Sequence, residues 1–339
     1  MAAGCLAKDD PDSKWPSFCP NKGASIFYAI LFAMTTIAHI AQAIIYRKGY
    51  SWVVIMSATW QTGCYVFHTL SIIHPTNETF YIVWFLLMLL APLWINAYVY
   101  MALGRMVYNF TSSARILKVK AWRFGLYFVL LDIFAFIIQA GGASMASGNN
   151  ISDSTMNRGL HIYMVGVGLQ QLFVLCFIYL ATRFQREMNR DLPAAEQRRP
   201  RRLLYVLYAV LILITIRIIF RLIEYAKGVD SGIPQHEVYQ YVFDSTMMLF
   251  GLVLLNVVHP GRIMPGKECD FPSRKQRKAA GKNGIQGRAG AGNTLPMYLM
   301  ARSSSPVQQP GVEPAYPNST YPKINAQTHS PGFVTEYGR

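Results

Sequence analysis

The sequence predicts an all-α fold, a bundle of seven transmembrane helices with its N-terminus outside the cell and its C-terminus in the cytosol. Three observations predict it. Apolar residues make up 52% of the chain and charged residues only 14%, which is more hydrophobic surface than a soluble domain buries. The apolar residues come in stretches of about 20, the length that a helix needs to cross a hydrocarbon core of about 30 Å. The basic residues are concentrated in alternate connections between these stretches.

Each apolar stretch is expected to be helical, because irregular backbone facing lipid leaves its amides and carbonyls without hydrogen-bond partners. A soluble helical bundle would show amphipathic stripes with charged outer faces, and these stretches do not. We expect three parts: an extracellular segment at 1–22, a seven-helix membrane domain at 23–262 and a disordered basic cytosolic tail at 263–339. The predicted spans are residues 24–46, 52–73, 80–101, 125–146, 160–182, 203–226 and 239–258.

Orientation follows from the basic residues. The connections that we place outside carry only Arg158 and Lys227, whereas every connection that we place inside is rich in Lys and Arg, as the positive-inside rule requires. The formal charge of +15 is therefore cytosolic charge facing an anionic leaflet, and no nucleic-acid partner is expected. The basic cluster at 274–278 is predicted to be a solvated run that supports this topology and contacts anionic lipid headgroups as a by-product.

The cysteines do not indicate a metal site. Cys5 and Cys19 lie in the extracellular segment, an oxidising location where they could form a disulfide; the sequence leaves this pairing open. Cys64 and Cys176 lie within spans and are expected to pack against apolar neighbours. No CxxC or Cys/His spacing suggests zinc, and we expect neither a metal ion nor another cofactor.

Polar residues inside the last four spans are the candidate functional site. An ionisable residue within a span costs about 2.5 to 3.5 kcal/mol on insertion scales, so each requires a partner or a water-filled cavity. In the sixth and seventh spans these residues repeat at helical spacing and so share one face of each helix. The candidates are Asp132 and Gln139 in the fourth span, Gln170 in the fifth, Arg217, Arg221 and Glu224 in the sixth, and Glu237, Tyr241 and Asp244 in the seventh.

Depth predicts which of these residues meet. Arg221 and Asp244 each lie five residues from the outer end of their spans, about 7 to 8 Å below the outer surface at 1.5 Å per residue, and are expected to pair. Arg217 lies nearer the midplane, where Asp132 or Gln139 could reach it. We expect one buried polar cluster around a hydrated hollow that opens outward. The alternative is that these residues only lock the helices together. In the third span, Pro92 is expected to produce a kink.

Several segments resemble one family, the fungal resistance-to-aminocholesterol (RTA-like) lipid-translocating exporters. The resemblance covers nearly the whole membrane domain. It implies a fungal seven-span protein linked to movement of lipids such as sphingoid bases or to resistance to lipophilic toxins. We expect the protein in the plasma membrane, with other cell membranes left open. The resemblance also assigns the polar positions above, apart from Tyr241, to the family's site. The segments are PLWINAYVYMALGRMVY at 92–108, DIFAFIIQAGG at 132–142, GVGLQ at 166–170, IRIIFRLIEYAKG at 216–228 and EVYQYVFDSTMMLFGLVLLNVVHPG at 237–261.

The chain departs from the family pattern in the second span. The family commonly shows an acidic residue followed by Gly-Tyr, whereas this chain has WQTGC at 60–64. A group that could move a proton or bind an amine is therefore missing there, which leaves the substrate class and any proton coupling open.

We predict a transporter or translocase of lipids or lipophilic compounds, such as sphingoid-base or sterol-like amphiphiles, and not an enzyme. No Walker motif is present, so movement would be facilitated or ion-coupled. A seven-span lipid or stress sensor is the alternative, although the chain has no DRY triplet after the third span, no NPxxY in the seventh and no lysine there for retinal. An intramembrane hydrolase using Asp132, Asp244 and a histidine-bound metal is disfavoured because the histidines lie at different depths. The oligomeric state is left open.

Overall fold

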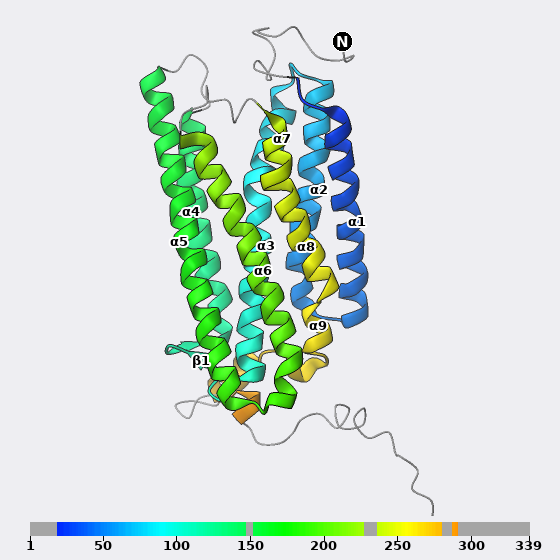
Figure 1. Ribbon diagram of the computed structural model, residues 1–339, viewed down its shortest axis with the longest axis vertical. Helices are drawn as coiled ribbons and strands as arrows, with labels where there is room; N and C mark the ends of the chain where they lie inside the picture. The colour runs from blue at the N-terminus through cyan, green and yellow to red at the C-terminus, as the bar shows by residue number, and fades with distance from the viewer. Residues whose placement is uncertain (1–18, 147–151, 227–235, 280–286, 291–339) are drawn as a thin grey trace, which may run out of the picture. The chain divides into compact units, whose positions relative to one another are not determined.

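The computed structural model describes residues 19–146, 152–226, 236–279 and 287–290. Within these ranges the chain is almost entirely helical, and the long helices run side by side along one axis (Figure 1). The long helices are α1 (Lys22–Tyr46), α2 (Trp52–Ile73), α3 (Glu78–Phe110), α4 (Ala121–Ala146), α5 (Asp153–Asp191), α6 (Ala194–Ala226) and a last segment made of α7 (Glu237–Gln240), the π-helical turn η2 (Tyr241–Ser245) and α8 (Thr246–Val257). The shorter elements are η1 (Gly49–Ser51), β1 (Arg115–Ile116), β2 (Val119–Lys120), α9 (Pro260–Ile263), η3 (Lys267–Cys269), α10 (Arg274–Ala279) and η5 (Arg288–Gly290).

Three of the long helices begin at side-chain caps. The side chains of Asn21, Asn77 and Ser152 accept hydrogen bonds from backbone N–H groups in the first turns of α1, α3 and α5, which satisfies donors that have no partner inside the helix. α1 ends at Arg47, which adopts a left-handed backbone conformation with φ of 50°. α5 and α6 extend past their predicted spans into the connection between them, so that only Leu192 and Pro193 separate the two helices.

Six helices in the described part of the chain are long and apolar enough to cross a membrane, and α2 is not among them. At 22 residues α2 is long enough, so its composition lowers its mean hydropathy. Its polar residues, Ser57, Gln61, His68 and Ser71 among them, are buried within the bundle. All seven predicted ranges are helical in the structure, and six of the helices are candidate spans. The seven-span topology and the positions of the termini stay predictions.

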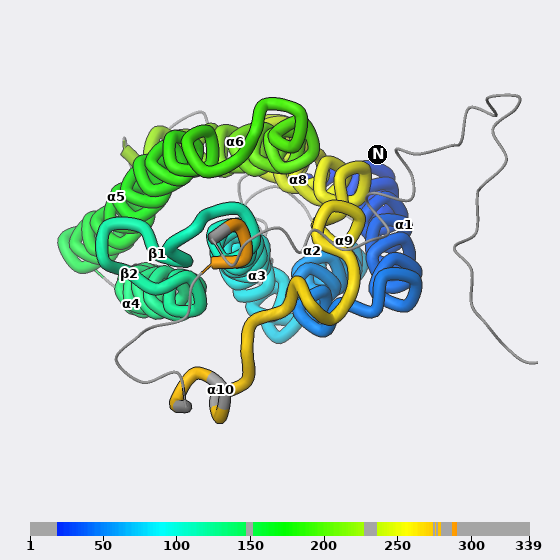
Figure 2. Tube along the Cα trace, turned by 90° about the horizontal axis from the view of Figure 1, so that it is seen from below, coloured from blue at the N-terminus to red at the C-terminus, as the bar shows by residue number. Residues whose placement is uncertain are grey.

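α3 is the central helix of the bundle. It packs against α2, α4, α5 and α6, and Figure 2 shows it between α2 and α4 when the bundle is viewed from below. More than half of its most apolar stretch is buried, whereas less than a quarter of that of α1 is. The outer surfaces of the surrounding helices expose large apolar side chains, such as Ile37 and Ile44 of α1 at 67% and 70%. Such surfaces suit hydrocarbon and not water.

Residues 264–271 pack against the end of the bundle that is predicted to face the cytosol, within the part that the sequence predicts to be a disordered tail. The Lys48 ammonium pairs with the Asp270 carboxylate at 3.2 Å. The Asn109 side chain donates to the Cys269 carbonyl oxygen at 3.0 Å. Composition alone shows that this segment has no core of its own, but not that α3 and the α1–α2 connection supply its partners.

The cysteines differ in state. Cys19 is disulfide-bonded, while Cys64, Cys176 and Cys269 are free. Cys5, the partner considered in the sequence, lies outside the described residues. Cys64 is buried as expected, whereas Cys176 is exposed on the outer surface of the bundle.

α4 and α5 approach each other closely at glycines. A Cβ atom placed on Gly142 would lie 2.6 Å from the Gly159 carbonyl oxygen, and one on Gly166 would lie 2.8 Å from the backbone nitrogen of Gln139. Both separations are too short for real atoms, so a side chain at either position would force the helices apart. Small residues at an interface allow transmembrane helices to pack this closely.

We expect Gly142→Ala to lower the temperature of thermal unfolding in detergent micelles, because the added methyl group collides with the backbone of α5. Overpacking of this kind costs about 1 to 3 kcal/mol. Gly141→Ala is the matched control, since a Cβ at Gly141 would meet no atom within 4 Å. Its unfolding temperature should stay the same or rise slightly, because alanine has the higher helix propensity. Equal effects of the two substitutions would contradict the close approach.

Candidate functional site

Four charged side chains meet between α6 and η2. The Arg217 Nε donates to Asp244 Oδ1 at 2.5 Å, Arg221 Nη2 donates to Asp244 Oδ2, and Arg221 Nη1 donates to Glu224 Oε2 at 2.8 Å. Each of the four is 5% exposed or less. We call these residues the ion network. The charges of its two arginines and two carboxylates sum to zero. The predicted pairing of Arg221 with Asp244 is confirmed.

α3 completes the ion network through a carbonyl that a proline leaves free. Pro92 lies inside α3 and has no N–H, so the carbonyl of Met88, four residues earlier, lacks its helical partner. Arg217 Nη2 donates to that carbonyl oxygen at 3.3 Å, and Arg221 contacts the Met88 sulfur. The sequence predicts the proline as a kink and misses this acceptor. The signal for this acceptor was in the sequence, because a proline within a span always leaves the carbonyl four residues earlier free to accept from a charged side chain.

Asp244 lies within the π-helical turn η2, a feature that the sequence analysis does not predict. In a π-turn one extra residue is accommodated, and such turns are frequent at functional sites. The Ser245 and Thr246 hydroxyls donate to the carbonyls of Gln240 and Tyr241, at 3.3 and 2.8 Å, and so supply partners where the regular ladder is interrupted. The last segment and α3 are therefore both irregular at the level of the ion network.

The remaining candidates of α4 and α5 form separate groups. Asp132 Oδ2 accepts from Asn96 Nδ2 and from the Tyr100 hydroxyl, both at 3.0 Å. Gln139 Nε2 donates to Gln170 Oε1 at 3.1 Å. All three candidates are buried.

The expectation that Asp132 or Gln139 reaches Arg217 is therefore wrong. α3 packs against both α4 and α6, and it supplies the partners of Asp132 as well as the Met88 carbonyl for Arg217. Helical spacing shows which face a residue occupies, but it does not show which helix stands opposite.

Glu237 and Tyr241 join the start of the last segment to α1 and α2. Glu237 accepts from the Asn21 backbone N–H at 2.6 Å and from the Tyr241 hydroxyl at 2.7 Å. The Tyr241 ring stacks on that of Tyr28, with ring centroids 5.0 Å apart, and Tyr65 lies next to both. Sequence reasoning missed this aromatic cluster, because its members come from three different helices.

The four charged groups of the ion network form ion pairs with one another. A pocket lies at the start of α6, but Arg202 in its lining is about 22 Å from Arg217 along the helix at 1.5 Å per residue. The hydrated hollow expected around the charges stays a prediction. Among the described residues, no three His, Cys, Asp or Glu side chains are placed to hold a metal ion.

A bundle of lipid-length helices with a neutral ion network in its interior defines an α-helical multi-pass membrane protein. Residues 54–267 match the model of the family described as RTA1 like protein. The chain belongs to this family, and the matched range contains every residue predicted to form the site.

Curated relatives extend the match. The chain is 42% identical over 267 residues to "Probable lipid transporter atnI" of Emericella nidulans, covering 75% of this chain and 70% of the relative. It is 28% identical to "Lipid-translocating exporter-like protein RTA1" of Leptosphaeria maculans, over 74% of this chain and 51% of that protein. It is also 19% identical to "Sphingoid long-chain base transporter RSB1" of Saccharomyces cerevisiae, over 78% of each. No solved structure matches the chain.

Asp244→Asn should destabilise the protein strongly, because it leaves two buried arginines with one carboxylate. Removing one partner of a buried ion pair costs about 3 to 5 kcal/mol. Adding Arg217→Gln restores the charge balance, so the double variant is expected to unfold at a higher temperature in detergent than Asp244→Asn alone. If the stability losses of the two single variants simply add in the double variant, Arg217 and Asp244 do not interact.

Proposed function

We propose that this protein is a transporter or translocase of amphipathic lipids or lipophilic compounds in the plasma membrane or another cell membrane, and that it has no enzymatic activity. The observation that carries the proposal is the ion network, a closed and charge-balanced group placed where α3 and the last segment are both irregular. Interrupted helices with charged partners at the interruption are a recurring way to build substrate sites in transporters. Relatives named as lipid transporters and as sphingoid long-chain base transporters support the same class.

The ion network provides a physical reason for opening only when a headgroup is present. Separating Arg217 or Arg221 from Asp244 in the apolar interior leaves charges unpaired, at a cost of about 3 to 5 kcal/mol. An anionic headgroup would replace Asp244 on the two arginines, and a cationic amine would replace an arginine on Asp244 or Glu224. In either case the lipid tail stays in hydrocarbon while the headgroup keeps the charges balanced.

The other candidate residues have supporting places in this proposal. Glu237 and Tyr241 lie at the outer end and would control the path between the ion network and the outside. Asp132, Gln139 and Gln170 link α4 to α3 and α5 and would keep these helices in place while α6 and the last segment separate. Without a nucleotide-binding motif in the sequence, the movement would be facilitated or coupled to an ion.

The proposal includes seven spans, with the N-terminus outside and residues 263–339 in the cytosol. Thr76 and Ser113 are both exposed, and they lie at opposite ends of α3. In intact cells, a membrane-impermeant thiol reagent should label Thr76→Cys, and it should label Ser113→Cys only after permeabilisation. The unsubstituted chain provides the background labelling. The reverse pattern would contradict the orientation, and equal labelling in intact cells would contradict a separation of the two connections by a membrane.

The functional test uses the charge-balanced variant Arg217→Gln/Asp244→Asn in reconstituted vesicles that contain a labelled long-chain base or phospholipid. We expect its flux to fall about tenfold or more, because a hydrogen bond to a charged group is worth about 1.5 to 3 kcal/mol. Arg123→Gln, which changes an exposed arginine of α4, should keep full flux. Normal flux in a folded double variant would show that the ion network has only a structural role. Lipid binding by the unsubstituted protein without any flux would favour the alternative function, a lipid sensor.

A further inference from the structure

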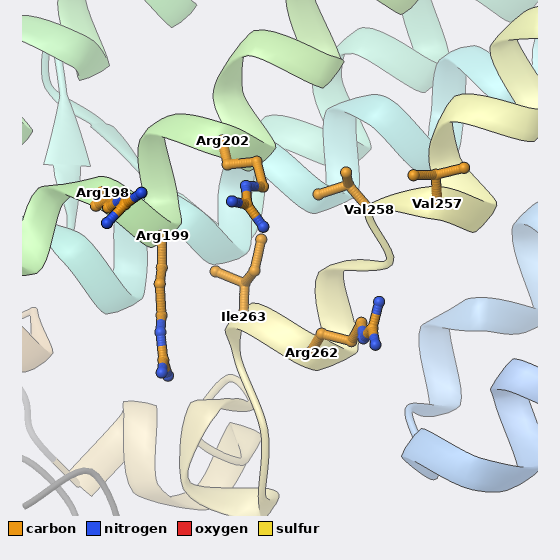
Figure 3. Close-up of a pocket in the computed structure, with 7 residues that line it drawn as sticks. All are labelled: Arg198, Arg199, Arg202, Val257, Val258, Arg262 and Ile263. Atoms are coloured by element: carbon orange, nitrogen blue, oxygen red, sulfur yellow. The ribbon is translucent and has the colours of Figure 1, made fainter. Parts of the chain in front are cut away.

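A pocket of about 420 Å³ lies at the inner end of the bundle, where the start of α6 faces the end of α8 and α9. Arginine dominates its polar lining (Figure 3). Figure 3 shows the Arg202 side chain of α6 extending toward Ile263 of α9. The arginines are Arg198, Arg199 and Arg202 of α6 and Arg262 of α9.

The pocket concentrates positive charge that no carboxylate in the described part of the chain pairs with. All four arginines are exposed, and in the described ranges no carboxylate lies within ion-pair distance of any of them. Arg198 and Arg202 are also four residues apart on α6, a spacing at which like charges repel each other and destabilise a helix. An anion bound between them would remove this repulsion. A guanidinium group matches phosphate especially well, because its planar fork can donate two parallel hydrogen bonds.

The rest of the pocket lining is apolar, and exposed apolar side chains continue from it along α8. Val257, Val258 and Ile263 complete the lining. Val257 is 62% exposed, and Val253 and Phe250 lie on the same face of α8 at 37% and 52%. This face belongs to a helix that is apolar enough to lie in a membrane. Positive charge at the end of the helix and an exposed apolar stripe beside it fit a molecule with an anionic head and a hydrocarbon tail.

We propose that this pocket binds the phosphate of an anionic phospholipid from the adjacent leaflet, with an acyl chain along the Phe250–Val253–Val257 face of α8. The site is separate from the ion network, and it does not depend on the transport function proposed above. Free phosphate would make the same hydrogen bonds to the arginines as a lipid headgroup. It has no hydrocarbon chain to cover the apolar face of α8, so this face favours a lipid over free phosphate.

The test is a titration of the purified full chain, held in zwitterionic phosphatidylcholine nanodiscs, with phosphatidylglycerol. We expect the lipid to raise the unfolding temperature and to remain bound in native mass spectrometry. In Arg202→Gln/Arg262→Gln the apparent affinity should fall about tenfold or more, because charged hydrogen bonds to phosphate are lost. Both side chains are exposed, so in phosphatidylcholine alone this variant should unfold at the wild-type temperature or slightly above it, because the repulsion between Arg198 and Arg202 is removed.

Arg186→Gln/Arg190→Gln is the matched control, since it removes the same charge from exposed positions of α5 at the same end of the bundle. It should keep wild-type affinity. Equal weakening in the control would show general attraction to a charged surface and overturn the site, as would absence of any response in the wild type. Inorganic phosphate is the second arm. If it alone reproduces the full response at equal concentration, the occupant is a free anion and the lipid proposal is wrong.

Discussion

An arginine in the interior of a lipid-length helix must be neutralised or hydrated, and α6 carries Arg217 and Arg221 one turn apart. Much of the surrounding architecture serves this requirement. Glu224 lies on the next turn of the same helix, and η2 brings Asp244 to both guanidinium groups. Pro92 leaves the Met88 carbonyl oxygen of α3 free to accept from Arg217 Nη2. Because Asp244 comes from the π-turn and the Met88 carbonyl from the proline site of α3, the ion network ties α3, α6 and the last segment together at one depth.

The sequence identified this group through periodicity and depth, which are properties of a single helix. Arg217, Arg221 and Glu224 fall on one face, and Arg221 and Asp244 lie equally far from the outer ends of their spans, which correctly predicted the pair. Properties that depend on a third helix were not accessible in this way. The place of α3 between α4 and α6 separates Asp132 from Arg217, and no residue pattern in either span indicates it. The π-turn is also invisible, because its stabilising hydroxyl groups resemble ordinary polar residues in a span.

α2 shows that the mean hydropathy of a helix does not describe the part of its surface that faces outward. Its average is lowered by residues such as Gln61 and His68, which are 4% and 1% exposed, whereas Trp52 and Val66 on its outer face are 55% and 44% exposed. A helix in a bundle meets lipid with only part of its surface, so an average over all residues understates how apolar that part is. Gln61 occupies the stretch where the family commonly has an acidic residue, and its burial shows that this position faces the protein interior.

The docked segment after α9 also affects where the protein can be shortened. Lys48 is only 4% exposed, and its charge is balanced by Asp270. Phe271 packs edge to face against Tyr108 and lies over the Arg105 guanidinium. A chain cut at residue 262, where the last apolar stretch stops, would therefore retain every lipid-length helix and still strand a buried ammonium at the base of α1. The folded unit includes Phe271, and expression fusions should be joined beyond it.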